Sequence, residues 1–215
     1  MSKFNIFVAT EEHLEYVDVV LNAIAEAAKV RGTGIAKRSP EYIQKKMEER
    51  KAILALHKGE FAGFCYIETW GHDKFVANSG LIVVDKFRAN GLAKAIKSKA
   101  FELSRERYPQ AKIFGLTTGL AVMKINSDLG YRPVTFSELT DDEQFWKGCQ
   151  SCVNYDILVR TERKHCLCTG MLFDPMKATQ ANGKKTLNML SRLRDAVRKS
   201  DGKIGKTLKS LTALF

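Results

Sequence analysis

One short stretch, in which a glycine separates an apolar run from a helix-like run, constrains this chain most. Residues 80–84 read GLIVV, which favours a buried strand, and they lead past Arg88 and Gly91 into residues 92–108, where apolar side chains recur every three or four positions. The first turn of a helix carries unpaired backbone amides and partial positive charge, so it can bind an anion. Gly91 lacks a Cβ and lets the backbone approach such an anion closely. The stretch predicts a strand, a phosphate-binding turn and a helix, with a plain strand-to-helix turn as the alternative.

The remainder of the first 175 residues alternates between strand and helix patterns. Thr10, Ser39 with Pro40, and Gly130 stand where helix caps are expected. A hairpin is predicted around residues 58–60, between two apolar runs. Strands are predicted at residues 4–9, 52–57, 61–70, 76–84, 112–118, 131–136, 153–159 and 166–173. Helices are predicted at residues 11–28, 40–51, 92–108 and 120–130. The pattern indicates an α/β chain.

The length of 215 residues suits one sizeable core with an appendage. No apolar run approaches the roughly 18 residues that a spanning helix needs. The N-terminus meets acidic residues after only a few apolar ones, unlike a signal peptide. Five cysteines without a secretory signal favour reduced thiols. We therefore expect a cytoplasmic protein, and the sequence is compatible with a homodimer as well as a monomer.

The net charge of +11 is concentrated in the last forty residues. Residues 176–215 hold ten Lys or Arg against two Asp, a charge of +8, which leaves +3 for residues 1–175. Two apolar stripes with basic flanks run through this tail. The tail is predicted to be a separate helical segment. It can dock on the body of the protein, bind an anionic membrane surface or contact nucleic acid.

The six residues RANGLA at 88–93 resemble motif A of the GNAT superfamily of N-acetyltransferases, whose pattern is Q/R-x-x-G-x-G/A. The order of predicted elements over about residues 3–160 is also similar to that superfamily. The resemblance implies a central, mostly antiparallel sheet flanked by helices, and acyl-coenzyme A as co-substrate. It also implies that loop amides hold the pyrophosphate and that the preceding strand pairs with the pantetheine arm. The coenzyme-binding residues would then be Leu81, Ile82, Val83, Val84, Arg88, Ala89, Asn90, Gly91, Leu92 and Ala93.

Transfer to an amine needs a base for the acceptor and an acid for the leaving thiolate. Glu68 is the candidate base, because the resemblance puts it on the strand beside motif A; a solvated surface carboxylate is the alternative. Many members of the superfamily carry an acid Tyr four residues before a Gly-aromatic pair, and here that position is Asn126. Asn126 would then take part in catalysis or hydrogen-bond the coenzyme, and water or Tyr131 would serve as the acid.

A second resemblance concerns the acceptor. The segment from 112 to 134 is similar to the acyltransferase domain of N-acetylglutamate synthases, with matching letters at Leu116, Thr117, Thr118, Gly130, Tyr131, Pro133 and Val134. It implies a small amino acid such as glutamate as acceptor and a role in amino-acid metabolism. Arg31, Lys37 or Arg38 could then bind its carboxylate, because a guanidinium offers a bidentate match. The rival hypothesis is a non-catalytic binding module that acts through its basic tail.

Four of the five cysteines stand close together in the sequence. Cys149 and Cys152 form a C-x-x-C pair, and Cys166 and Cys168 form a C-x-C pair. Four thiolates can bind zinc, but a hairpin between the predicted strands at 153–159 and 166–173 would separate the pairs, so buried thiols are the other interpretation. Cys149 as an acyl-carrying nucleophile has no base paired with it in the sequence.

Overall fold

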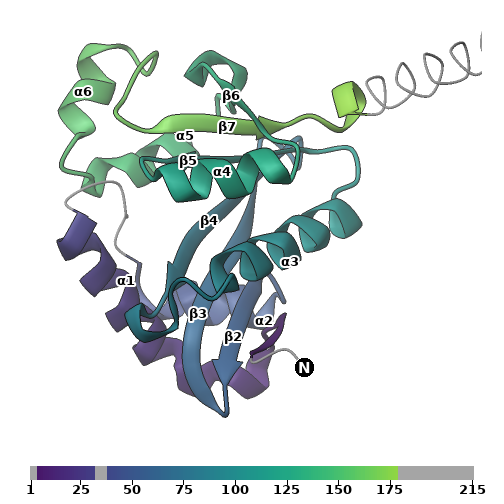
Figure 1. The fold of residues 1–215 in the computed structure, drawn as a ribbon. Coiled ribbons are helices and arrows are strands. Elements are labelled where there is room, and N and C mark those ends of the chain that lie inside the picture. Colours follow the sequence, from purple (N-terminus) through teal and green to yellow (C-terminus); the bar gives the residue numbers. More distant parts are fainter. Residues whose placement is uncertain (1–3, 32–37, 179–215) are drawn as a thin grey trace, which may run out of the picture. The chain divides into compact units, whose positions relative to one another are not determined.

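A computed structural model describes residues 4–31 and 38–178 of the chain, which divides into two units between Pro175 and Met176. A seven-stranded sheet forms the centre of the first unit, in the order β1-β2-β3-β4-β5-β7-β6 (Figure 1). The strands are β1 Asn5–Val8, β2 Ala52–His57, β3 Glu60–Trp70, β4 Phe75–Val83, β5 Lys112–Thr117, β6 Arg132–Val134 and β7 Thr169–Phe173. β4 and β5 are parallel, and the other neighbouring strands in this order are antiparallel. The predicted mixed, mostly antiparallel sheet is confirmed.

Helices cover both faces of this sheet. They are α1 Val17–Arg31, α2 Pro40–Glu48, α3 Leu92–Arg107, α4 Leu120–Asp128, α5 Glu143–Lys147 and α6 Tyr155–Arg160, with 3-10 turns at Glu11–Tyr16, Asp85–Phe87, Phe136–Glu138 and Gly148–Ser151. Alternate strand residues face opposite sides, so Cys65 and Ile67 pack with α3 whereas Phe64 and Tyr66 pack with α1 and α2. A third cluster packs α5 and α6 against Phe114. Among the described residues no helix has the length and apolarity needed to cross a bilayer.

The predicted caps and turns are confirmed. The Ser39 side chain accepts a hydrogen bond from the Tyr42 amide (3.2 Å), and Pro40 opens α2. Gly130 follows α4 with a φ of +88°. Lys58 and Gly59 both have positive φ, as a two-residue hairpin turn requires. These local signals need no tertiary context, which is why the sequence alone located them.

The strand predicted at residues 153–159 is wrong. The segment contains α6 instead, and the strand predicted at 166–173 begins only at Thr169. β7 is already paired with β5 on one side and with β6 on the other, so no edge is left for a further strand. As a helix the segment buries Leu158 in the cluster with Trp146 and leaves Val159 exposed. The hairpin that the sequence predicted between the cysteine pairs therefore does not form.

Candidate functional site

The site begins where two parallel strands separate. β4 and β5 pair only from Phe75–Ala77 with Lys112–Phe114, and the residues that follow on each strand are not paired with each other. Gly80 sits in an irregularity of the β3–β4 ladder with a φ of +66°, and a Cβ there would meet the Tyr66 ring at 2.7 Å. The sheet thus opens into a fork with its vertex after Ala77 and Phe114.

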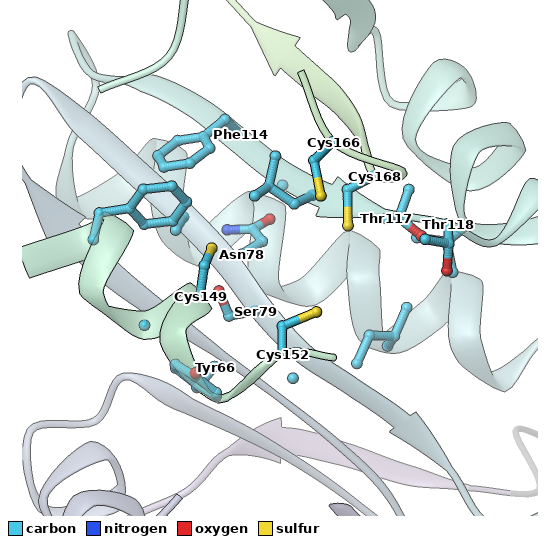
Figure 2. Close-up of a pocket in the computed structure, with 18 of the residues that line it drawn as sticks. Tyr66, Asn78, Ser79, Phe114, Thr117, Thr118, Cys149, Cys152, Cys166 and Cys168 are labelled. Carbon is cyan, nitrogen blue, oxygen red and sulfur yellow. The ribbon is translucent and has the colours of Figure 1, made fainter. Parts of the chain in front are cut away.

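A cavity of about 460 Å³ occupies this fork (Figure 2). The separated parts of β4 and β5 form two of its walls, and α1, the start of α2, β3, α3, α4 and the segment 144–168 contribute the other lining residues. Leu81 and Ile82, two residues predicted to bind the coenzyme, line it, whereas Val83 and Val84 do not. The Val84 amide bonds to the Ala62 carbonyl at 3.0 Å. No Asp or Glu is among the described lining residues, but Arg38 and Lys97 are.

The turn before α3 has the geometry that an anion site needs. Within the described part of the chain the backbone N–H groups of residues 89–94 make no hydrogen bond, and the first that does is that of Ala95. Gly91 has a φ of +74°, and a Cβ built on it meets no atom within 4 Å. The side-chain amide of Asn90 donates hydrogen bonds to the backbone carbonyls of Phe87 (3.3 Å) and Arg88 (2.9 Å) and so stabilises the turn. The exposed amides and the positive helix end fit a phosphate group.

Arg88 takes a supporting position beside this turn. Its guanidinium forms an ion pair with Asp85 (2.6 Å), and its Nε donates to the Val83 carbonyl (3.3 Å). About half of the side chain is exposed, so the charge lies at the surface and does not line the cavity. Leu92 is buried under the turn and Ala93 is half-buried against the α3 core. The loop therefore presents its unbonded backbone amides to solvent together with the partly exposed Arg88 side chain.

Two polar side chains reach the fork without a hydrogen bond or ion pair to any residue that the structure describes. The Oδ1 atom of Asn126 is buried and makes no hydrogen bond within the described residues. Lys97 is buried, its Nζ lies 5.3 Å from the centre of the Tyr131 ring, and no carboxylate in the described ranges pairs with it. Burial lowers the pKa of Lys97 to about 8. The predicted residue Asn126 thus lies in the cavity, and Lys97 was not predicted.

Arg38 lies at the opposite side of the cavity from α3. Its Nε donates to the Tyr66 hydroxyl (2.7 Å), and its guanidinium lies 5.4 Å from the centre of the Tyr42 ring. Of the three predicted carboxylate-binding residues, the structure brings Arg38 into the lining. Lys37 lies outside the described residues, as does the side chain of Arg31, the last residue of α1.

Glu68 does not line the cavity. Its carboxylate is held by the Lys46 ammonium and accepts a hydrogen bond from the Tyr42 hydroxyl at 2.7 Å. Lys46 is buried, so this ion pair is largely shielded from water. The structure thus places the Glu68 carboxylate in an internal pair outside the cavity, and its role as the base stays a prediction.

Tyr131, the alternative acid, points into the protein. Its hydroxyl donates to Asn78 Oδ1 (2.9 Å), and the Asn78 amide donates to the Ser104 hydroxyl (2.8 Å). Burial raises the pKa of Tyr131 well above its ordinary value. Tyr131 does not line the cavity, so it is not positioned to protonate a group bound there.

Four thiols line the side of the cavity formed by the segment 144–168. Figure 2 shows the side chains of Cys149, Cys152, Cys166 and Cys168 around the hollow. Burial, reinforced by the neighbouring thiols, raises the pKa of Cys149 to about 11 and that of Cys168 to about 12. At neutral pH these thiols stay protonated, which disfavours Cys149 as a nucleophile. Across the described ranges no three His, Cys, Asp or Glu side chains are arranged to hold a metal ion, so zinc gains no support.

Sequence reasoning missed Lys97, although a signal was present. Lys97 stands four residues after Ala93 and three before Ala100, which puts a lysine on the apolar stripe of α3. A lysine on a buried stripe is uncommon unless it is paired or functional. Tyr42 and the cavity side of α5 were missed as well, because their approach to β4 depends on tertiary packing.

The fold resembles those of several solved proteins. No protein-family model matches the chain, and no curated protein matches its sequence. The structure is similar to N-acetylglutamate synthase from Neisseria gonorrhoeae, solved with coenzyme A and N-acetyl-glutamate, at a TM-score of 0.58 and 14% identity. That match covers 81% of this chain and 35% of the other, so this chain spans about a third of that synthase.

Two further matches cover nearly the whole of the other protein. A GNAT family acetyltransferase from Staphylococcus aureus matches at a TM-score of 0.53 and 15% identity, over 65% of this chain and 91% of the other. The yncA protein of Salmonella typhimurium, solved with its cofactor acetyl-CoA, matches at 0.53 and 12%, over 81% and 95%. The chain therefore has the fold of the GNAT acetyltransferases, as the resemblance in its sequence implied.

Proposed function

We propose that this chain is an acyl-coenzyme A-dependent N-acyltransferase that moves an acetyl group to the amine of a small molecule. The observation that carries the proposal is the fork between β4 and β5, with a cavity inside it and unbonded amides just after β4. An extended ligand with amide groups and a diphosphate fits those features: backbone groups of an unpaired strand recognise amides, and the start of α3 recognises phosphate.

The coenzyme would supply an activated acyl thioester, and the residues of this chain would bind and orient it. The amides of residues 89–94 would bind the diphosphate. The exposed edge of β4 at Leu81 and Ile82 would pair with the pantetheine arm. Asn126 would satisfy its buried Oδ1 by accepting a hydrogen bond from an amide of that arm. Water is removed from the acyl group by the segment 144–168, which adds side chains to the cavity wall.

The acceptor site favours an anionic amine. The described lining holds two cations and no carboxylate, and Arg38 stands on the side away from α3. A guanidinium binds a carboxylate in a bidentate way, so an amino acid such as glutamate suits this side better than a polyamine. The acceptor ammonium would lose a proton to water in the cavity and so become the free amine, because Glu68 is held by Lys46.

The coenzyme site is tested by Gly91→Asp. A Cβ built on Gly91 meets no atom within 4 Å, so an Asp side chain fits there. Its carboxylate should repel the diphosphate and weaken coenzyme A binding by about 100-fold, equivalent to roughly 2.7 kcal/mol. Gly91→Asn is the matched control, since it imposes nearly the same backbone strain without the charge. Calorimetric titration with coenzyme A measures both. Equal affinities of the two variants for coenzyme A would show that the diphosphate does not bind at this turn.

The acceptor class is tested by Arg38→Met. Loss of a charge-assisted hydrogen bond of roughly 1.5–3 kcal/mol should raise KM for an amino-acid acceptor by about 10- to 100-fold while leaving the affinity for coenzyme A unchanged. An amine without a carboxylate is the control acceptor, and its KM should not rise. A thiol-release assay with a panel of amino acids and polyamines gives these constants. An equal rise for both acceptor types would contradict a carboxylate at Arg38.

A further inference from the structure

A buried amine stands at the vertex of the fork. Lys97 projects from the second turn of α3, and its Nζ would lie 3.8 Å from a Cβ built on Gly115. Gly115 directly follows Phe114, the last residue of β5 that pairs with β4. The carbonyl of Asn78, the residue after the last paired position of β4, is 3.4 Å from the same point. The Lys97 amine therefore lies where the two strands begin to separate, at the deep end of the cavity that it helps to line.

The surroundings of this amine are poor in charge. The ionisable groups packed against it are the Cys65 thiol of β3 and the Tyr131 phenol, both buried and both with a raised pKa. No carboxylate in the described part of the chain forms an ion pair with it. A buried ammonium without a counter-charge costs free energy, so a structural role alone does not account for a lysine here.

The candidates for a proton donor at this vertex are few. Asn126 occupies the position where many GNAT proteins carry an acid tyrosine, and a carboxamide does not donate a proton. Tyr131 directs its hydroxyl to Asn78. Cys149 and Cys168 pack beside Ala77 and Phe114 on the face of the sheet away from α3, and burial raises the pKa of both thiols. The Cys65 thiol is buried and does not line the cavity. Among the described residues, Lys97 is therefore the candidate donor that lines the cavity at the vertex.

We propose that Lys97 is the proton donor of the acyl transfer, its ammonium facing the sulfur of the acyl thioester at the vertex of the fork. This inference rests on the proposed function. The acceptor nitrogen forms a bond to the acyl carbon, and the carbon–sulfur bond then breaks with its electron pair moving to sulfur. The Lys97 ammonium gives its proton to that sulfur. The proton released by the attacking nitrogen returns to the Lys97 amine through water, so the cycle balances.

The acidity of the two partners suits this exchange. An alkyl thiol has an ordinary pKa of about 8.5. Burial brings the pKa of Lys97 to about 8, so a proton moves between the two groups with little change in free energy. An ordinary exposed lysine, with a pKa of about 10.4, would hold its proton more firmly than the thiolate needs.

The test compares the wild type with Lys97→Met and Lys97→Arg in complex with coenzyme A. The ultraviolet absorbance of the thiolate reports the ionised fraction of the bound thiol and needs no acceptor. With an ammonium beside the sulfur, the wild type and Lys97→Arg should hold roughly ten times more thiolate at neutral pH than Lys97→Met, a shift of about one pKa unit. Equal thiolate in all three complexes would overturn the inference and leave the proposed function intact. Failure of the wild type to bind coenzyme A would remove both.

Turnover separates proton transfer from simple charge. Both variants should lose about 100-fold in kcat with little change in KM, since Met has no proton to give and Arg does not release one. The wild-type rate should fall on the alkaline side as the ammonium is lost, and this limb should be absent in both variants. A wild-type kcat for Lys97→Arg would show that charge alone suffices, and the assignment of a proton donor would be wrong.

Discussion

Two buried lysines on opposite faces of the sheet meet very different surroundings. Lys46 of α2 is held by the Glu68 carboxylate and lies 4.9 Å from the centre of the Tyr42 ring. Lys97 of α3 has a ring beside it but no carboxylate, and nearby Asn126 has an oxygen without a partner. The first cluster is paired within the protein, whereas the second has no hydrogen bond or ion pair among the described residues. The difference separates polar groups that are paired within the fold from polar groups that, under the proposed function, would bind a substrate.

The strongest way to break this comparison is Lys46→Met. Removing one partner of a largely buried ion pair leaves the Glu68 charge behind, which should lower the free energy of unfolding by about 3 kcal/mol. Lys86→Met is the control, because its pair with Glu60 is about half exposed and should contribute less than about 1 kcal/mol. Urea unfolding measures both losses. A loss no larger than that of the control would mean that the pair does not hold the fold.

Lys97→Met should raise the free energy of unfolding, whereas Lys46→Met should lower it. The folded protein holds this lysine at a pKa of about 8, below its unfolded value of about 10.4, so the unfolded state binds more protons between these values. Wild-type stability should therefore rise with pH across that window. The variant lacks this dependence, and at neutral pH without ligand it should be more stable by about 2 to 3 kcal/mol.

Urea unfolding of the two proteins at neutral and at strongly alkaline pH gives the measurement. The advantage of the variant should shrink as the pH passes from about 8 toward 10.4. A variant that is less stable than the wild type at neutral pH would show that Lys97 supports the fold, and the contrast between the two lysines would disappear.

Asn126→Leu should give the smallest effect of the three. Replacing an amide whose buried oxygen has no partner by an apolar group of similar size should stabilise the ligand-free protein by about 1 kcal/mol. The same change should weaken coenzyme A binding, since the ligand would lose its hydrogen bond. Thermal unfolding with and without coenzyme A separates the two effects. A destabilised ligand-free variant would indicate that the oxygen is already satisfied.

The sequence predicted the parts of the site that depend on local chemistry. Gly91, the helix after it and the caps at Ser39 and Gly130 follow from rules that act within a few residues. The mixed sheet was implied by the resemblance of motif A and of the element order to the GNAT superfamily. The turn at residues 88–91 and the helix after it were therefore predicted correctly, whereas coenzyme binding there stays a prediction.

The parts that failed depend on contacts between distant segments. The pair between Lys46 of α2 and Glu68 was not predicted, because no pattern near Glu68 indicates it; the role of Glu68 as the base stays a prediction. The segment 153–159 alternates like a strand, yet β7 has no open edge to receive it. The burial of Lys97 was not predicted, because a lysine on a helix is usually assumed to be exposed to solvent. Its position on the apolar stripe of α3 is the signal that indicates burial. The basic tail beyond residue 178 lies outside the described structure, so its docking, membrane and nucleic-acid alternatives stay predictions.

The separation of β4 from β5 also bears on how this protein survives in solution. Past Ala77 and Phe114 these neighbours no longer support each other, so the two halves of the sheet are joined along a short seam. A molecule that binds across the gap raises the free energy of unfolding, and the gain grows with the logarithm of its concentration divided by Kd. At a concentration a hundred times Kd the gain is about 2.7 kcal/mol. The fraction of folded protein would then depend on the concentration of its substrate. At low substrate concentration the chain would unfold more often and be cleaved faster by proteases.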